Sequence, residues 1–393
     1  MTLADRWLLP DGIEEVLPPG AQQIEHLRRR LLDLMDGWGY DLVMPPVLEY
    51  LDALLTGTGK DLDLRTFKVT DQISGRMLGL SADTTPQVAR IDAHSLAPQG
   101  IGRFCYCRTV FHTRARSLLA SRTPTQIGAE LFGEAGAEAD VEILGLMLSL
   151  LAASAVDNVH LDIGNVGVYR AIAEQAGVTA VQQAELFDLL KLKCASDIDA
   201  WAEREIADSN SRAALQLLAR LQGTPDNLEV GFGKLTALVP AAAGELEHIR
   251  VVASQILARF PAVPLYIDLT ELRGYQYHTG LVFGAYVPGY GDAIAQGGRY
   301  DETGKAFGRA RPARGFSADL RVLARLGNFV PERKPLVLAP TSDDAALWQQ
   351  VNELRQQGMR VISCREQDTQ QADYSLQTIN GQWQLVSVQP VQD

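Results

Sequence analysis

The segment that most constrains the fold of this chain is residues 271–280, where polar and aromatic side chains stand between two apolar runs. The runs at 263–269 and 281–287 are rich in apolar residues, which is typical of β-strands. Strands fix the ends of the segment and its two glycines relax the backbone, so side chains such as Arg273 and His278 can be directed at one small molecule. The alternative is an aromatic-rich hairpin that carries a surface arginine.

Length and charge limit the classes of protein to which the chain can belong. With 393 residues it is expected to form two or three domains, and 46% hydrophobic against 21% charged residues indicates a soluble globular protein. The 36 Lys and Arg residues against 48 Asp and Glu residues give a net charge of −12, which repels phosphate and disfavours a nucleic-acid partner. The 4 cysteines form no disulfide framework, and no apolar stretch reaches the ~18 residues of a membrane span. We therefore expect a cytoplasmic protein without a membrane partner.

The N-terminal region is predicted to hold a long helix followed by a short strand. Apolar residues of the helix, residues 21–38, recur three or four positions apart and form one apolar face. Residues 41–44 form the strand, and two prolines end it. A long helix, a short strand and a proline are similar to the first of three signature motifs of class II aminoacyl-tRNA synthetases. That resemblance implies a homodimer interface.

Two further stretches place polar side chains on defined backbone. Asp83 comes directly before a predicted helix, so its carboxylate either caps the helix or faces a ligand. In the predicted strand 125–132, Gln126, Gly128 and Glu130 lie two apart and therefore on one face. That face is either the polar floor of a pocket, with room above the glycine, or a solvated surface.

The remaining sequence predicts the domain organisation. Periodicity turns helical from about 167 to 258, which indicates an inserted all-α region. The run Gly315-Phe316-Ser317 is expected to open a helix that extends to Leu326. Residues 331–335 are expected to form a linker, and residues 336–393 to form strand, helix, strand and strand. We therefore expect two domains: residues 1–330, interrupted by the helical insertion, and a small C-terminal α/β domain.

The patterns for a metal or a cofactor are incomplete. Cys105 and Cys107 lie on one face of a strand, but no second pair of cysteines or histidines follows at the spacing of a zinc site. The stretch 56–61 lacks two of the residues that a phosphate-binding P-loop requires. We therefore expect neither a metal site nor a cofactor.

Four segments carry a resemblance that covers residues 5–326. They are Leu80-Ser81-Ala82-Asp83-Thr84-Thr85, Gln126-Ile127-Gly128-Ala129-Glu130, Leu272-Arg273-Gly274 and Gly297-Gly298-Arg299-Tyr300-Asp301. Their order resembles that of the catalytic domain of histidyl-tRNA synthetase, which implies an α+β fold: a class II synthetase-like antiparallel sheet flanked by helices. In that family the matching positions read the amino acid histidine. The ligand-binding residues implied here are Asp83, Thr85, Gln126, Glu130, Arg273, Tyr277 and His278.

The chemistry of these residues suits histidine. The two carboxylates are acceptors for an ammonium group and an imidazole N–H, and the threonine and glutamine side chains add neutral hydrogen bonds. Arg273 can make a charge-assisted pair with the ligand's carboxylate. His278 stands where the family usually has a second tyrosine facing the imidazole, so recognition of the ring differs from the family pattern.

The residues that would hold ATP also differ from the family pattern. The second class II motif places an arginine for the α-phosphate directly after a phenylalanine, and this chain has His112 there. The third motif ends with an arginine for the γ-phosphate, and the matching position is Val322. Arg321 is adjacent, but one residue along a helix turns the side chain by ~100°. Each lost contact is worth roughly 1.5–3 kcal/mol in the ground state, so we expect no adenylation and no catalytic residue.

The charge of the C-terminal region also argues against a tRNA synthetase. Residues 331–393 hold 5 Lys and Arg against 8 Asp and Glu, a net charge of −3, so we expect no tRNA binding. A chain with a histidine pocket and no ATP chemistry is similar to the regulatory subunits of ATP phosphoribosyltransferase, also in the pattern Thr84-Thr85-Pro86-Gln87-Val88-Ala89-Arg90.

This second resemblance implies a non-catalytic regulatory subunit for the first step of histidine biosynthesis. The implied partners are the short-form ATP phosphoribosyltransferase catalytic subunit, a second copy of the chain in a homodimer within a hetero-oligomer, and free histidine as the feedback ligand. The alternatives are a divergent histidyl-tRNA synthetase and a stand-alone histidine sensor or RNA-associated module.

Overall fold

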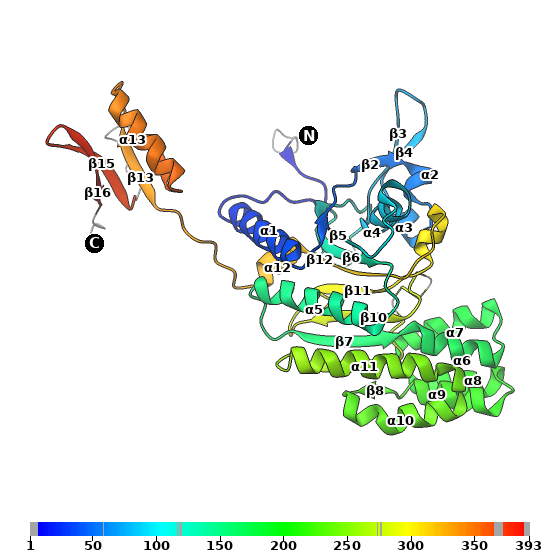
Figure 1. Cartoon of the computed structure of the whole chain (residues 1–393). Helices are drawn as coiled ribbons and strands as arrows, with labels where there is room; N and C mark the ends of the chain where they lie inside the picture. Colours follow the sequence, from blue (N-terminus) through cyan, green and yellow to red (C-terminus); the bar gives the residue numbers. More distant parts are fainter. Residues whose placement is uncertain are drawn as a thin grey trace. The chain divides into compact units, whose positions relative to one another are not determined.

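The computed structural model describes residues 7–57, 59–115, 117, 120–272, 274–275, 277–364 and 372–388. The chain divides into two compact units, of which the first ends at Phe329 and the second begins at Val330. Each unit has a hydrophobic core of its own, and Figure 1 shows the elements of both. Within the described segments, none of the helices combines the length and the apolar character that a bilayer crossing requires.

The first unit is built on a nine-stranded sheet with the order β1-β5-β6-β12-β11-β10-β7-β9-β8. The strands in that order are Asp41–Leu42, Gly102–Thr109, Thr125–Phe132, Ala313–Asp319, Ala295–Arg299, Leu281–Tyr286, His160–Asn165, Leu265–Asp268 and Gln222–Gly223. Pairing is antiparallel except between β1 and β5 and between β7 and β9. The mainly antiparallel sheet predicted from the sequence is confirmed.

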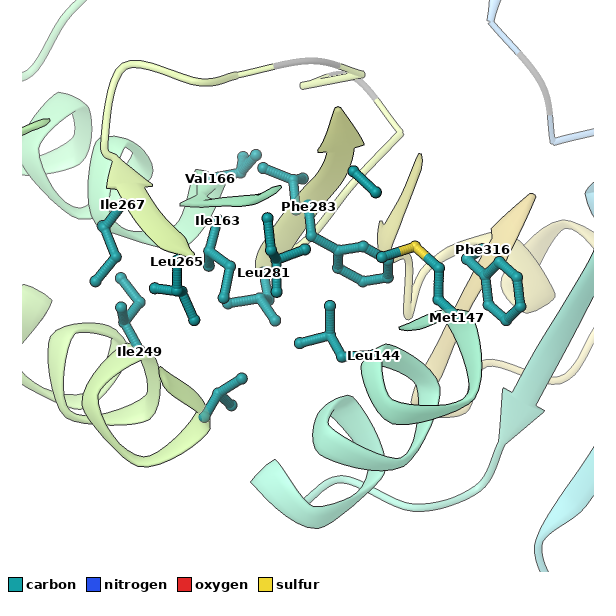
Figure 2. Packing of buried hydrophobic residues seen from close by; sticks show 14 of the residues in the cluster. Leu144, Met147, Ile163, Val166, Ile249, Leu265, Ile267, Leu281, Phe283 and Phe316 are labelled. Carbon is teal, nitrogen blue, oxygen red and sulfur yellow. The ribbon is translucent and has the colours of Figure 1, made fainter. Parts of the chain in front are cut away.

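Helices cover one face of this sheet and bury its apolar side chains. Leu144 and Met147 of α5 (Ala137–Ala153) and Ile249 of α11 (Ala243–Arg259) pack against sheet residues such as Ile163 and Phe283 (Figure 2). The helix α5 is apolar on nearly all sides because it lies between the sheet, α11 and α1 (Gly20–Gly37). Burial of each such side chain contributes about 1.5–3 kcal/mol.

The helical insertion leaves the sheet directly after β7. It consists of α6 (Val166–Ala176), α7 (Ala180–Leu192), α8 (Ala195–Glu205), α9 (Ser209–Leu218), α10 (Pro225–Leu238) and α11, interrupted by β8. Polar residues begin three of these helices: the Asn165 side chain accepts from Gly167 N, Thr179 forms a capping box with Gln182, and Asp208 accepts from Ser211 N.

The N-terminal part of the chain also forms a second, three-stranded sheet with the order β2-β4-β3. Its strands are Leu48–Tyr50, Met77–Leu80 and Lys68–Thr70, and the short helices α2 (Leu51–Leu54) and α3 (Lys60–Arg65) connect β2 to β3. The helix α4 (Thr85–Arg90) follows β4 and continues as a π-helix over Ile91–Leu96. After β11, a 3₁₀ turn spans Thr303–Phe307, and α12 (Leu320–Leu326) follows β12.

The second unit holds one strand more than the sequence predicted. Its sheet has the order β14-β13-β15-β16, with strands Arg360–Cys364, Leu336–Pro340, Tyr374–Ile379 and Gln382–Ser387, and α13 (Ala345–Gln356) packs on it. The last two strands form a hairpin around Asn380 and Gly381, whose φ angles of 51° and 77° suit a two-residue turn. Half of the residues in each of these two strands are exposed, and the strand prediction missed one of the two.

Two expectations about the first sheet were wrong. Segment 271–280 does not join neighbouring strands, because β7 lies between β9 and β10 and the segment crosses the end of β7. Gly315-Phe316-Ser317 lies within β12, and the helix begins only at Leu320. The glycine marks a close approach within the sheet: a Cβ at Gly315 would lie 1.6 Å from Glu130 Oε2.

Candidate functional site

A cavity of about 180 Å³ opens where β6, β10, β11 and β12 meet the start of α4 and the segment after β9. Five of the seven predicted ligand-binding residues line it: Asp83, Thr85, Glu130, Tyr277 and His278. Gln126 lines a neighbouring cavity, and Arg273 lies outside the described residues. The structure therefore brings together residues that are distant in the sequence around one small cavity.

Glu130 is the centre of the polar network in this cavity. Its side chain is only 1% exposed and accepts hydrogen bonds from Thr85 Oγ1 at 2.8 Å, from Tyr106 OH at 3.1 Å and from Tyr300 OH. Burial raises the pKa of Glu130 to about 8, because the three hydroxyl donors only partly offset the loss of water. The Glu130 carboxyl group therefore holds its proton at neutral pH.

Gly128 has a different role from the one expected. A Cβ at this position would lie 2.7 Å from Tyr106 OH and 2.3 Å from the carbonyl oxygen of Phe316. The room above the glycine is therefore filled by the Tyr106 side chain, which in turn donates to Glu130. The shared face of Gln126, Gly128 and Glu130 is polar and enclosed, and the solvated alternative is wrong for Glu130.

Asp83 combines the two roles that its sequence context left open. Its Oδ1 accepts from the free backbone N–H of Thr85, the first residue of α4, at 3.2 Å, although the N-cap position itself is Thr84. The same oxygen accepts from Gln126 Nε2 at 2.9 Å, and Gln126 Oε1 accepts from Thr84 N at 2.9 Å. Gln126 thus fixes the turn that points Asp83 at the cavity, although its own side chain lines the neighbouring one.

Aromatic side chains form another part of the cavity wall. The Tyr277 ring stacks on Tyr300 at a centroid distance of 5.2 Å and meets the His278 ring edge-on at 5.4 Å. His278 Nδ1 lies 3.2 Å from the carbonyl oxygen of Arg299, and burial lowers the pKa of His278 to about 4. The ring is therefore neutral, Nδ1–H donates to the carbonyl, and Nε2 is left as an acceptor.

Sequence reasoning missed most of the residues that line the cavity, among them Tyr300, Asp162 and Glu271. Tyr300 belongs to the Gly297–Asp301 segment that carried the resemblance, so its position offered a signal that was not used. Glu271 belongs to the segment 271–280 that the sequence singled out, although it was not predicted to bind a ligand. No local pattern marks Asp162 of β7, because its place in the cavity depends on which strands become neighbours. Burial raises the pKa of Asp162.

The neighbouring cavity is larger, about 530 Å³, and shares Tyr286, Gln296 and Ser317 with the first. His112 and Val322, the positions at which the sequence lacks the two phosphate-holding arginines, both line it. His112 Nε2 lies 2.8 Å from the Arg65 guanidinium and 2.9 Å from the carbonyl oxygen of Ala82.

Carboxylates balance the basic side chain in this larger cavity. Among the described lining residues Arg65 is the one basic side chain, and it faces a cavity that Asp292 and Asp319 also line. This arrangement does not suit a triphosphate, whose negative charges require several basic groups or bound cations.

Comparisons with known proteins decide the family. The family model described as histidyl-tRNA synthetase matches residues 12–323, and the model described as the ATP phosphoribosyltransferase subunit HisZ C-terminal domain matches residues 334–386. An ATP phosphoribosyltransferase regulatory subunit of Chromohalobacter salexigens is 49% identical, with 98% of this chain and 99% of that protein covered. One of Cellvibrio japonicus is 46% identical, with 99% of each chain covered.

The chain belongs to the ATP phosphoribosyltransferase regulatory subunit family. The family predicted from the sequence is therefore confirmed, and the naming of its members as regulatory subunits supports the predicted non-catalytic role. A solved structure of an ATP phosphoribosyltransferase regulatory subunit/histidyl-tRNA synthetase from Bacillus halodurans has the same fold, with a TM-score of 0.79 at 23% identity over 93% of this chain and 94% of that one. Among the residues described for this family member, no group of three or more His, Cys, Asp or Glu side chains is arranged to hold a metal.

Proposed function

We propose that this regulatory subunit binds free histidine in the 180 Å³ cavity and thereby controls a separate catalytic subunit, the short-form ATP phosphoribosyltransferase, in the cytoplasm. The observation that carries the proposal is the contrast between the two cavities. The smaller one places the hydrogen-bonding groups of Glu130, Thr85 and Asp83 around a space suited to an amino acid, whereas the larger one has His112 and Val322 at the positions for phosphate-holding arginines.

The geometry of the small cavity supports histidine as the ligand. Glu130 and Asp83 offer carboxyl oxygens for an imidazole N–H and an ammonium group, and Thr85 adds a hydroxyl. His278 Nε2 offers a neutral acceptor beside the Tyr277 ring. Arg273 remains the residue that we expect to pair with the ligand's carboxylate.

The homodimer within the complex is also a proposal, and exposed apolar residues near β1 support it. The strand β1 lies at one edge of the nine-stranded sheet. Leu42, Met44 and Val47 are 43%, 77% and 45% exposed there. An edge strand with apolar side chains is suited to pair with a second copy of the chain. We propose no tRNA partner, since the C-terminal region is acidic.

Mixing this protein with a short-form catalytic subunit is expected to raise phosphoribosyltransferase activity, and added histidine is expected to reverse much of the gain. A regulatory subunit acts by binding the active and inactive states of its partner with different affinity, typically by about 1–3 kcal/mol, which is roughly a five- to 150-fold change. The measurement is the initial rate with and without this chain over a histidine titration. Equal rates and equal histidine sensitivity with and without this chain would contradict the proposal.

The isolated protein is expected to show no histidine-dependent exchange of pyrophosphate into ATP. The physical reason is the replacement of two phosphate-holding arginines by His112 and Val322 in the larger cavity. Incorporation of labelled pyrophosphate into ATP is the assay, with an active histidyl-tRNA synthetase as its positive control. Exchange that depends on histidine would support the divergent synthetase instead.

A further inference from the structure

The described residues 274–275 and 277–280, here called the pocket loop, lie against the start of the helical insertion. Because β7 separates β9 from β10, the loop must cross the end of β7, where α6 begins. The backbone N–H of Val166, the first residue of α6, donates to the carbonyl oxygen of Gly280 at 2.9 Å. The loop supplies Tyr277 and His278 to the ligand cavity, so its position determines the shape of the aromatic wall.

Arg170 of α6 holds the pocket loop by its main chain. Its guanidinium donates to the carbonyl oxygens of Tyr275 at 3.0 Å and of His278 at 2.8 Å. The same guanidinium lies 5.3 Å from the centroid of the Tyr275 ring. Hydrogen bonds from a charged donor are stronger than neutral ones, and two of them to one short loop fix its curvature.

The Tyr275 side chain enters the insertion itself. Its ring lies 5.2 Å from that of Tyr169 of α6 and 5.6 Å from that of Phe187 of α7, and its hydroxyl is hydrogen-bonded to Gln183. Gln183 and Phe187 are four residues apart, so they share one face of α7. Two residues further on, Tyr277 faces the ligand cavity. The loop therefore has one aromatic side chain in the insertion and the next in the cavity wall.

A second link joins the insertion to the segment before the loop. Lys193, which ends α7 with a φ of 53°, places its Nζ 2.5 Å from Asp268 Oδ2 and 4.0 Å from Glu271 Oε2. Glu271 lines the ligand cavity. The residue that follows α7 therefore contacts β9 and Glu271, while α7 itself contacts Tyr275 of the pocket loop.

We infer that Arg170 is a positioning residue for the ligand cavity. We also infer that helices α6 and α7 change when a ligand occupies this cavity. A ligand that orders Tyr277 and His278 also orders Tyr275, and through it the faces of α6 and α7 that hold this ring. The relation is reciprocal: loosening Arg170 from the loop weakens ligand binding. The inference rests on the proposed function, in that the probe ligand is histidine.

The test is calorimetric titration of histidine into the full-length protein and its variants. Arg170→Ala is expected to lower histidine affinity at least about tenfold because the loop loses two charge-assisted hydrogen bonds, and Arg170→Lys is expected to restore part of the loss. The matched control is Arg212→Ala, because Arg212 also donates to backbone carbonyls within the insertion, at Ile206 and Ala207, away from the pocket loop. Its histidine affinity is expected to stay within about twofold of wild type.

Hydrogen exchange supplies a readout that a purely structural role would not change. Saturating histidine is expected to slow amide exchange over residues 180–192 in the wild type and in Arg212→Ala, and to have no such effect in Arg170→Ala. If Arg170→Ala fails to fold, Tyr275→Phe serves instead, since it keeps the ring and removes the hydrogen bond to Gln183.

The outcomes separate this inference from the proposed function. Wild-type protein that binds no histidine overturns both. Histidine binding that Arg170→Ala leaves unchanged, or that Arg212→Ala weakens equally, overturns the role of Arg170 alone.

Discussion

A Glu130→Gln variant is expected to lose the fall in stability that the wild type shows between about pH 4.5 and pH 8. In the folded protein burial holds the pKa of Glu130 at about 8, against 4.5 for an ordinary glutamate. Between these values the folded state binds a proton that the unfolded chain releases, so the stability that Glu130 contributes is complete below pH 4.5 and falls as the pH rises to about 8. At 1.36 kcal/mol per pH unit the total is about 5 kcal/mol. Glutamine does not titrate and is expected to remove this loss.

The measurement is the free energy of unfolding in urea at a series of pH values from 5 to 9, for the wild type and for Glu130→Gln. Glu302→Gln, at an exposed position beside Lys305, is the matched control and is expected to follow the wild-type curve. Stability curves that stay parallel for Glu130→Gln and wild type would contradict the raised pKa.

An Asp140→Ala variant is expected to lose about 3–5 kcal/mol of folding free energy. Asp140 in the first turn of α5 and Arg314 of β12 are both 0% exposed, and Arg314 Nε lies 2.9 Å from Asp140 Oδ1. The contact is an ion pair without hydrogen-bond geometry, while Asp140 Oδ2 lies 2.8 Å from His248 Nε2. Removal of the carboxylate leaves the buried Arg314 guanidinium without its counter-charge.

The control for this variant is Asp199→Ala, which breaks the exposed pair between Asp199 and Arg220. Exposed pairs contribute at most ~1 kcal/mol, so this variant is expected to unfold close to the wild type. Urea unfolding near neutral pH measures both. Equal losses of unfolding free energy in the two variants would mean that the buried pair does not stabilise the packing of α5 on the sheet.

The sequence predicted those parts of the site whose geometry is local. Gln126 and Glu130 share a face because a strand alternates its side chains, and the strand was placed at its observed ends. Asp83 precedes a helix in both sequence and structure. The family resemblance placed Thr85 and Tyr277 in the same cavity, which no periodicity could have done.

Features that depend on the order of strands in the sheet could not be predicted from the sequence. Nothing near residue 163 indicates that β7 separates β9 from β10, so segment 271–280 looked like a hairpin and Asp162 went unnoticed. The sequence around Gly315 predicts a helix start, whereas in the structure this glycine makes room for the Glu130 side chain on the adjacent strand. The pairing of Asp140 with Arg314 likewise joins two residues with no local pattern in common.

The crossing of the pocket loop over the end of β7 has a consequence for how this protein can be altered by recombination. A helical insertion that entered and left the sheet at one point could be exchanged between relatives as an independent module. Here the first helix of the insertion begins at the strand end on which the loop rests, and Val166 is hydrogen-bonded to Gly280. A chimaera that takes the helices from a relative must therefore also take residues 271–280 from it. The insertion and the aromatic wall of the ligand cavity are thus inherited as one unit.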